Sequence, residues 1–229
     1  MWQRLTEEAP QFFGYYNLIF LAEAAFATFA LSAVGCVLGF LLGFVIAVVR
    51  RTLAWELVPL RSLAFLFTEF FRRVPFLVTL MLVFFVFQAL GANISVFTVA
   101  LISVVLIATA FIAEIIRAGL ESVHRNQWDA AAAMNFSLWQ TIWHVAMPQA
   151  WKIVIPPAFS FFILFIKDTA LASQIGVLEL TYAAKVLNNK GFSAALVFGS
   201  VLILYFALSY PLTRLGMWME TRLATRGHR

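Results

Sequence analysis

Few ionisable side chains of this sequence lie inside its apolar runs. Glu23 lies near the start of the first run, and the adjacent Lys167 and Asp168 lie well inside a later one. Charges placed in this way are costly unless they meet water, a partner or a bound ion. Glu23 therefore either reaches the membrane surface or faces a solute path, where it would favour cationic solutes. Lys167 and Asp168 point about 100° apart on a helix, so they form ion pairs with another segment or one of them lines a cavity.

Sequence patterns of common catalytic sites are missing. No phosphate-binding G-x-x-x-x-G-K-[ST] loop is present, so we expect no ATP hydrolysis by this chain alone. His124, His144 and His228 lack the spacing of metal ligands. A Ser-His-Asp site is not indicated either, because polar residues gather at the ends of the apolar runs. We therefore expect a chain that is not an enzyme and that binds no metal or cofactor itself.

The composition predicts an integral membrane protein. Of the 229 residues, 63% are hydrophobic and only 12% are charged, with a mean hydropathy of +0.91. A span needs about 20 apolar residues. Five runs qualify, at about residues 18–49, 70–90, 94–117, 153–175 and 194–214. The first is too long for a bilayer alone and should tilt or project beyond it. Its Gly35, Gly39 and Gly43 recur every four residues, which predicts close packing on another helix.

Basic residues mark one side of these spans. The net charge of +5 is dispersed over span ends, which indicates membrane topology rather than nucleic-acid binding. Charges before the first span are mixed, whereas arginines follow it. We therefore predict an external N-terminus and a cytoplasmic C-terminus. Residues 50–69, the polar interval at residues 114–150 and the basic tail would be cytoplasmic. The basic residues on that side are Arg50, Arg51, Arg61, Arg72, Arg73, Arg117, Arg125, Lys152, Arg214, Arg222, Arg226 and Arg229.

The polar interval at residues 114–150 predicts two short helices. Asn126 is a candidate N-cap, with Asp129 at the third helical position near the free backbone amides. Asn135 can close the first helix in the left-handed conformation. Ser137 and Gln140 fit a capping box that starts a second helix, which Pro148 would stop.

Two further polar blocks lie at the ends of apolar runs. Thr68 and Glu69 precede the second run, with Arg72 and Arg73 at its edge and Pro75 in its first turn. Glu69 and Arg73 are spaced to form an ion pair along a helix. Residues 156 and 157 are both proline and should kink the fourth span or delay its start. Residues 176–193 form the longest external connector, either a solvated loop or a docking site for a binding protein.

Three ordered blocks resemble the permease subunits of bacterial ABC importers. Residues 129–131 and 135 resemble the EAA motif of these permeases, with Asp for Glu and Asn for Gly, and residues 145–150 resemble its closing segment around Pro148. TEFFRRVPFLV at residues 68–78 and KDTAL at residues 167–171 resemble two blocks of the polar amino acid branch. Arg73 and Ala170 depart from the usual Gly and Ser. The resemblance covers about residues 15–220.

The resemblance implies an all-α, type I importer permease fold with five transmembrane helices in one domain, residues 1–229. A cytoplasmic coupling loop, about residues 118–151, would bind an ATPase subunit. The expected coupling residues are Asp129, Ala130, Ala131, Asn135 and Pro148. The expected residues of the substrate path or gate are Glu23, Thr68, Glu69, Arg72, Pro75, Lys167, Asp168 and Thr169.

The same resemblance implies the partners of this chain and the function of the assembly. The partners are an ABC ATPase dimer that uses ATP and Mg²⁺, a second identical or homologous permease subunit, an extracytoplasmic binding protein and membrane lipid. The transported solute would be a polar amino acid, with cationic amino acids among the candidates. The assembly would lie in a bacterial inner membrane. Uptake of opines or other amino-acid derivatives is the alternative within this class.

Two other functions compete with this interpretation. A self-sufficient secondary transporter or channel should show internal repeats or coupling-ion carboxylates near the membrane midplane. We see no repeat, and Lys167 and Asp168 are the only strong charges at that depth. A membrane-anchored assembly factor without transport activity is the second. The paired-helix loop and the long connector argue against both, by analogy only.

Overall fold

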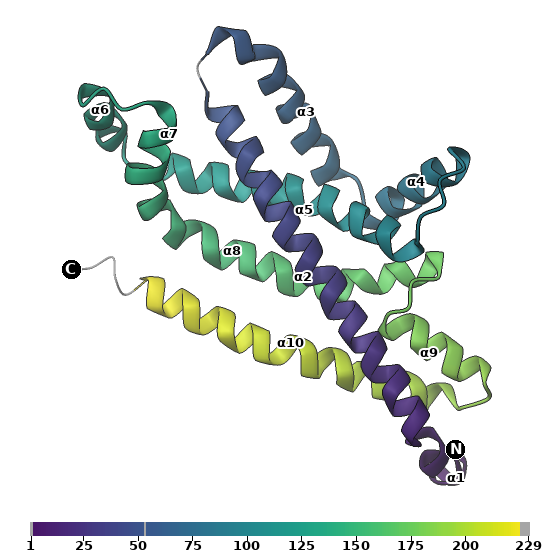
Figure 1. Cartoon of the computed structure of the whole chain (residues 1–229). Helices are drawn as coiled ribbons and strands as arrows, with labels where there is room; N and C mark the ends of the chain where they lie inside the picture. The colour runs from purple at the N-terminus through teal and green to yellow at the C-terminus, as the bar shows by residue number, and fades with distance from the viewer. Residues whose placement is uncertain (1, 53, 225–229) are drawn as a thin grey trace. The chain divides into compact units, whose positions relative to one another are not determined.

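The computed structural model describes residues 2–52 and 54–224, and these form helices and no strands (Figure 1). Arg226 and Arg229 of the basic tail lie outside the described residues. The α-helices are α1 (Trp2–Phe12), α2 (Tyr15–Arg51), α3 (Val58–Arg73), α4 (Phe76–Ala89), α5 (Val96–Glu121), α6 (Arg125–Ala133), α7 (Leu138–Thr141), α8 (Met147–Asp168), α9 (Leu180–Asn189) and α10 (Ala194–Ala224). Shorter turns of other helical types are η1 (Trp55–Leu57), η2 (Ile142–Ala146) and η3 (Thr169–Ile175).

Four helical segments are long and apolar enough to cross a membrane: Tyr15–Arg51, Val96–Glu121, Leu138–Ile175 and Ala194–Leu223. The interrupted pair Trp55–Arg73 and Phe76–Ala89 would supply a fifth. Helix formation is the expected result, because a backbone in lipid must satisfy its amides and carbonyls internally. The all-α polytopic fold is confirmed. The 37 residues of α2 correspond to about 56 Å, well beyond one hydrocarbon layer.

The second span differs from the prediction. We expected one helix at residues 70–90 with Pro75 in its first turn and a cytoplasmic connector at residues 50–69. Instead, α3 covers much of that connector and ends at Arg73, and Val74 is extended at φ −90° and ψ 132°. The reason is local, because a proline disfavours the helical conformation of the residue before it. Pro75 therefore separates α3 from α4.

The prolines of the fourth span were expected to kink it or to delay its start, and the second alternative is wrong. Pro156 and Pro157 lie inside α8, which begins nine residues earlier at Met147. They do not delay the start of this helix. A long apolar helix tolerates proline where its neighbours hold the segment in place.

The chain divides into two compact units that interleave along the sequence, one of residues 1–35, 76–104 and 163–213 and the other of residues 36–75, 105–162 and 214–229. We call them unit 1 and unit 2. The single domain expected from the sequence stays a prediction. The core of unit 1 joins the start of α2 to α9 and α10. Its buried residues are Phe12, Leu21, Ala24, Leu180, Ala183, Ala184, Leu187, Val197 and Val201.

Close helix packing in unit 2 depends on small residues. A Cβ on Gly39 would lie 2.4 Å from the Cβ of Ala108, and one on Gly43 would lie 2.9 Å from the amide nitrogen of Ala113. Distances this short leave no room for a side chain, so α2 and α5 approach at backbone contact. In unit 1, a Cβ on Gly35 would likewise lie 2.3 Å from Val104 Cγ1. The close packing predicted from the glycine spacing is confirmed.

Replacing Gly39 by leucine should destabilise the chain, because the added side chain must displace α5. Over-packing of this kind costs about 1–3 kcal/mol. The measurement is the thermal unfolding midpoint of the purified chain in detergent. Gly199→Leu on α10 is the matched control, since nothing lies within 4 Å of a Cβ there. Equal losses in both variants would contradict the packing argument.

Candidate functional site

The polar interval forms two short helices that lie side by side, α6 and α7, between the apolar helices α5 and α8 (Figure 1). The N-cap of α6 is His124 rather than Asn126, because His124 Nδ1 accepts a hydrogen bond from the Asn126 amide at 3.3 Å. The helix therefore begins at Arg125. This start moves Asp129 past the first turn, away from the predicted third position. Its carboxylate lies 3.8 Å from the Arg125 guanidinium instead.

The end of α6 is closed as predicted. Asn135 has φ 58°, the one positive value of a residue other than glycine in the described chain. Its amide donates to the Ala132 carbonyl at 2.9 Å, and the Phe136 amide donates to the Ala131 carbonyl at 3.0 Å. These two bonds make the Schellman pattern that satisfies the last carbonyls of a helix. Asparagine adopts the left-handed conformation more readily than most residues.

The capping box that starts α7 is also confirmed. The Gln140 amide donates to Ser137 Oγ at 3.3 Å, and the Ser137 amide donates to Gln140 Oε1 at 2.9 Å. Pro148 does not stop the second helix, which was the prediction. A wider turn, η2, follows α7, and α8 starts at Met147, so Pro148 stands in the first turn of a new helix. A proline fits there because first-turn amides need no partner within the helix.

The loop has an inner and an outer face. Ala131, Ile142 and Ala146 are buried, and Val154 of α8 approaches Gly119 of α5 so closely that a Cβ there would lie 2.3 Å from Val154 Cγ2. Ala131, which we expected to contact an ATPase, therefore packs inside the chain. The outer face carries exposed Asp129, Ala130, Asn135 and Pro148 and the large apolar side chain of Met134, whereas the half-exposed rings of Trp139 and Trp143 contact α2.

Aromatic rings connect this loop to α2 within unit 2. Trp139 and Trp143 stack with ring centroids 5.9 Å apart, and Phe44 meets both edge-on. Phe40 stacks on Trp151 of α8 at 5.8 Å. Aromatic pairs of this geometry add about 0.5–1.5 kcal/mol each beyond their burial. A displacement of α7 would therefore be transmitted to α2.

A network of charges lies around Glu114, where α2, α3 and α5 meet in unit 2. Glu114 Oε2 lies 3.1 Å from Arg50 Nη1 and 3.7 Å from Arg72 Nη1, and Glu114 Oε1 accepts from Arg117 Nη2 at 2.5 Å. The same Arg50 Nη1 donates to the fully buried Thr68 Oγ1 at 3.1 Å. One carboxylate thus holds three arginines from three helices.

The structure brings together three of the predicted gate residues, Thr68, Glu69 and Arg72. Glu69 lies 3.7 Å from Arg72, and its expected ion pair with Arg73 is present. The sequence reasoning missed Glu114, Arg50 and Arg117 as members of this group, because it used the two arginines only as topology signals. The signal that could have found them is a carboxylate in α5 and an arginine at the end of α2, both adjoining apolar helix surfaces.

Pro75 lies in unit 2, at the break after α3, and the other four predicted path residues lie in unit 1. Glu23 is exposed on α2, and Lys167 is exposed at the end of α8. Within the described residues, no ion pair joins Lys167 or Asp168 to another span. Thr169 is fully buried and donates to the Ile166 carbonyl at 2.7 Å, a bond to its own helix. The structure leaves the role of these four residues as a prediction.

A buried carboxylate that sequence reasoning treated as part of a connector lies in unit 1. Glu179 is fully buried and caps α9, where it accepts from the amides of Thr181 at 2.8 Å and Tyr182 at 2.7 Å. It also accepts from Tyr205 Oη at 2.8 Å. Burial raises the pKa of the Glu179 carboxyl, and the hydrogen bonds from Thr181, Tyr205 and Tyr182 act in the opposite direction. Residues 176–193 are therefore a packed element and not a plain solvated loop.

Replacing Glu114 by glutamine should destabilise unit 2, because three arginines lose their shared charge in a place that is mostly shielded from water. Loss of a hydrogen bond to a charged group costs about 1.5–3 kcal/mol. Thermal unfolding of the purified chain measures the loss. Glu121→Gln is the control, since Glu121 is 49% exposed and pairs only with Arg117 among the described residues. A larger loss for Glu121→Gln would refute the central role of Glu114.

Comparison with known proteins gives the context of this site. The chain is 30% identical over 218 residues to the probable glutamine ABC transporter permease protein GlnP of Bacillus subtilis, covering 92% of this chain and 98% of that one. It is 34% identical to the probable amino-acid ABC transporter permease protein YckA of the same organism, covering 79% of each.

Solved structures show the same fold. An amino acid ABC transporter crystallised with histidines matches with a TM-score of 0.80 and 26% identity, covering 90% of this chain and 94% of that one. The inward-facing MetNI methionine ABC transporter matches with a TM-score of 0.77 at 21% identity, covering 92% and 99%, which shows the fold alone.

The family model described as binding-protein-dependent transport system inner membrane component matches residues 39–225. This range includes the charge network, both short helices and the exposed face of the loop. The chain therefore belongs to the inner membrane components of binding-protein-dependent transport systems.

Proposed function

We propose that this chain, with a second permease subunit, forms the path of a polar amino acid through a bacterial inner membrane, and that residues 118–151 couple it to a separate ATPase. The observation that carries the coupling role is the outer face of the loop. Caps within the chain satisfy the backbone groups at the ends of α6 and α7, so these ends need no partner. The side chains of Asp129, Ala130 and Met134 are nevertheless exposed to solvent. A polar loop that exposes apolar side chains is typical of a docking surface.

The substrate class is inferred from the relatives. The names of the two Bacillus relatives refer to glutamine and to amino acids, and that of the solved structure to an amino acid ABC transporter. A polar amino acid is therefore the best-supported solute of this chain. A derivative such as an opine would fit the same chemistry.

The partners and the mechanism follow from the family. An ABC ATPase dimer would supply ATP and Mg²⁺, so this chain would bind no cofactor and catalyse no reaction, and a binding protein would deliver the solute on the other side. Five spans enclose too little space for an amino acid path, which is why we infer a dimer of permease subunits, identical or homologous. Closure of the ATPase dimer would move α5 and α8 through the loop and switch the access of the path. A monomeric complex that transports would contradict this.

The orientation is inferred from charge. Arg50, Arg51, Arg61 and the loop all belong to unit 2, and the positive-inside rule assigns such arginines to the cytoplasm. This orientation puts the N-terminus outside and the C-terminus in the cytoplasm. It also puts the exposed face of the loop on the side where ATP is available.

A variant that carries Asp129→Arg and Ala130→Trp should lose ATPase binding, because it reverses a charge and adds bulk on the exposed face of α6. Wild type and variant are co-purified with the candidate ATPase, and ATP hydrolysis is measured in lipid vesicles. Removal of a central contact residue costs about 2 kcal/mol or more, which is at least a thirtyfold loss of affinity.

Glu220→Arg is the charge-matched control, since Glu220 is exposed on α10 outside the loop. If hydrolysis and ATPase binding remain intact in the loop variant, coupling does not occur here. A self-sufficient secondary transporter or channel would then be the better interpretation.

Glu23→Gln tests the substrate path. If the exposed carboxylate of Glu23 faces the path, its removal should lower uptake of arginine relative to glutamate, since a neutral amide no longer attracts a cation. The expected change in preference is about tenfold, the effect of one close charge in partly screened surroundings. Uptake into vesicles of the assembled transporter measures it, with Glu7→Gln as the control. An unchanged preference would indicate that Glu23 only reaches the membrane surface.

A further inference from the structure

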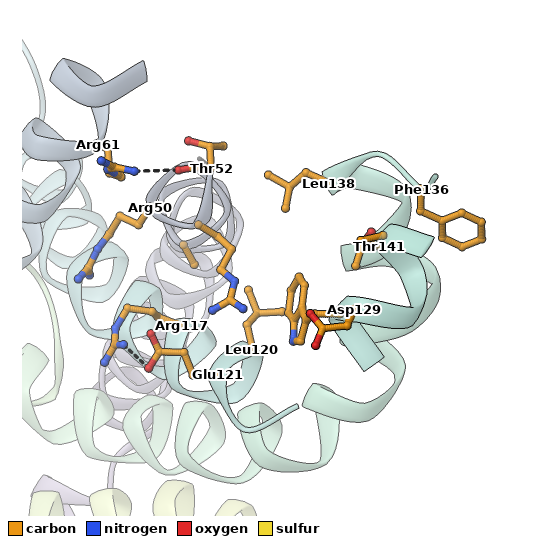
Figure 2. Close-up of a pocket in the computed structure, with 14 residues that line it drawn as sticks. Arg50, Thr52, Arg61, Arg117, Leu120, Glu121, Asp129, Phe136, Leu138 and Thr141 are labelled. Atoms are coloured by element: carbon orange, nitrogen blue, oxygen red, sulfur yellow. Dashed lines mark hydrogen bonds and ion pairs between the residues drawn. The ribbon is translucent and has the colours of Figure 1, made fainter. Parts of the chain in front are cut away.

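Unit 2 contains a cavity of about 670 Å³ beside the short helices, which Figure 2 shows in close-up. Its walls come from the ends of α2 and α5, the start of α3, and the two helices α6 and α7. Four arginines line it: Arg50, Arg51, Arg61 and Arg117. A volume of this size is typical of a site for a small ligand rather than a packing defect.

The charges of the cavity are not balanced. Only two carboxylates line it, Glu121 and Asp129, and both already have partners in Arg117 and Arg125. Arg50 is neutralised by Glu114. The cavity therefore keeps positive charge that its own acidic residues do not cancel.

Two of the arginines contact no carboxylate among the described residues. The Arg51 guanidinium lies over the Trp128 ring, 4.2 Å from its centroid, and Arg61 Nη1 donates to the Thr52 carbonyl at 3.0 Å. Stacking on a ring and one hydrogen bond to a carbonyl hold these two side chains in place and leave most of their N–H donors for another acceptor. The two guanidinium groups are therefore fixed in position, but no carboxylate neutralises their charge.

Two residues that line the cavity also carry buried donors without an acceptor. Trp128 Nε1 and Arg117 Nε are shielded from solvent and have no hydrogen-bond partner within the described part of the chain. These two atoms lie behind the cavity wall, so the donors that a ligand can reach are those of the unneutralised guanidinium groups.

From this combination we infer that the cavity binds a phosphate group. A phosphate carries three or four acceptor oxygens, which can take more of the N–H donors of two arginine forks than the two oxygens of a carboxylate can. Its bearer is either an anionic phospholipid or a soluble phosphate. Basic pockets between membrane helices bind the headgroups of such lipids, and the apolar side chains of Leu120, Phe136 and Leu138 give the cavity walls that a headgroup and its glycerol can contact.

A bound phosphate would join the loop to the spans. Arg51 belongs to α2, Arg61 to α3 and Trp128 to α6, so a ligand held in this cavity lies between three elements of unit 2. The position of α6 would then depend on the presence of the anion. This inference concerns binding by the chain alone and does not rest on the proposed transport function.

The test uses the purified full-length chain in uncharged detergent, freed of lipid. Its thermal unfolding midpoint is titrated with short-chain phosphatidylglycerol, with phosphatidylcholine of the same chain length, with inorganic phosphate and with acetate. Stabilisation by phosphatidylglycerol alone identifies a lipid headgroup as the bearer. Equal stabilisation by inorganic phosphate identifies a soluble one. Stabilisation by acetate as strong as by either phosphate, or by none of the four, overturns the inference.

Variants locate the site. Arg51→Gln and Arg61→Gln should each weaken phosphate binding about tenfold or more, the effect of losing a charge-assisted hydrogen bond. Arg214→Gln on α10 removes the same charge outside the cavity and should leave the affinity within about twofold. Trp128→Phe keeps a ring under Arg51 and removes only a shielded N–H, so it should leave the phosphate affinity within about twofold. Binding that survives both arginine substitutions, or that Arg214→Gln weakens equally, overturns the assignment.

Discussion

The structure depends on one constraint: a backbone in an apolar medium must satisfy its own amides and carbonyls. Long helices meet it over most of this chain, so each interruption needs a local solution. His124 caps the start of α6, Asn135 closes its end, and the Ser137–Gln140 box opens α7. The buried Glu179 does the same for α9. These interruptions are where the chain departs from an apolar helix and where it can meet other molecules.

Unit 2 gathers the polar features of the chain. The charge network around Glu114, the arginine-lined cavity and the outer face of the loop lie on the same few helices, and Arg50 and Arg117 belong to both the network and the cavity. A movement of α6 or α7 therefore reaches the charges directly through Trp128 and Arg51, and reaches α2 through the rings of Trp139, Trp143 and Phe44. If the loop binds an ATPase, as we propose, this arrangement gives it a mechanical route to the ends of the spans.

The loop also shows why a motif residue need not be a contact residue. Ala131 matches the motif but is buried, so its small size serves the packing of α6 inside the chain. Asp129 matches the motif and pairs with Arg125 on the surface. Small size and negative charge at neighbouring positions thus have different physical causes, one steric and one electrostatic.

The amino-acid sequence by itself determined the membrane class, the helical fold and the family. These depend on composition, on runs of about 20 apolar residues and on three short blocks, all of which are local along the chain. The closure at Asn135 and the box at Ser137 were also predictable, because each depends on residues within one or two turns. Their chemistry is the same in any tertiary context.

Only the tertiary structure decided which distant residues meet. The pairing of Glu114 with Arg117 follows from their i, i+3 spacing, but no spacing rule brings Arg50 of α2 and Arg72 of α3 to the same carboxylate. The N-cap at His124 and the break at Pro75 also differ from the prediction, but their causes are local: a side-chain cap, and the restriction that a proline puts on the residue before it. The start of α8 ahead of Pro156 and Pro157 is different, because packing against neighbouring helices can hold a proline inside a helix.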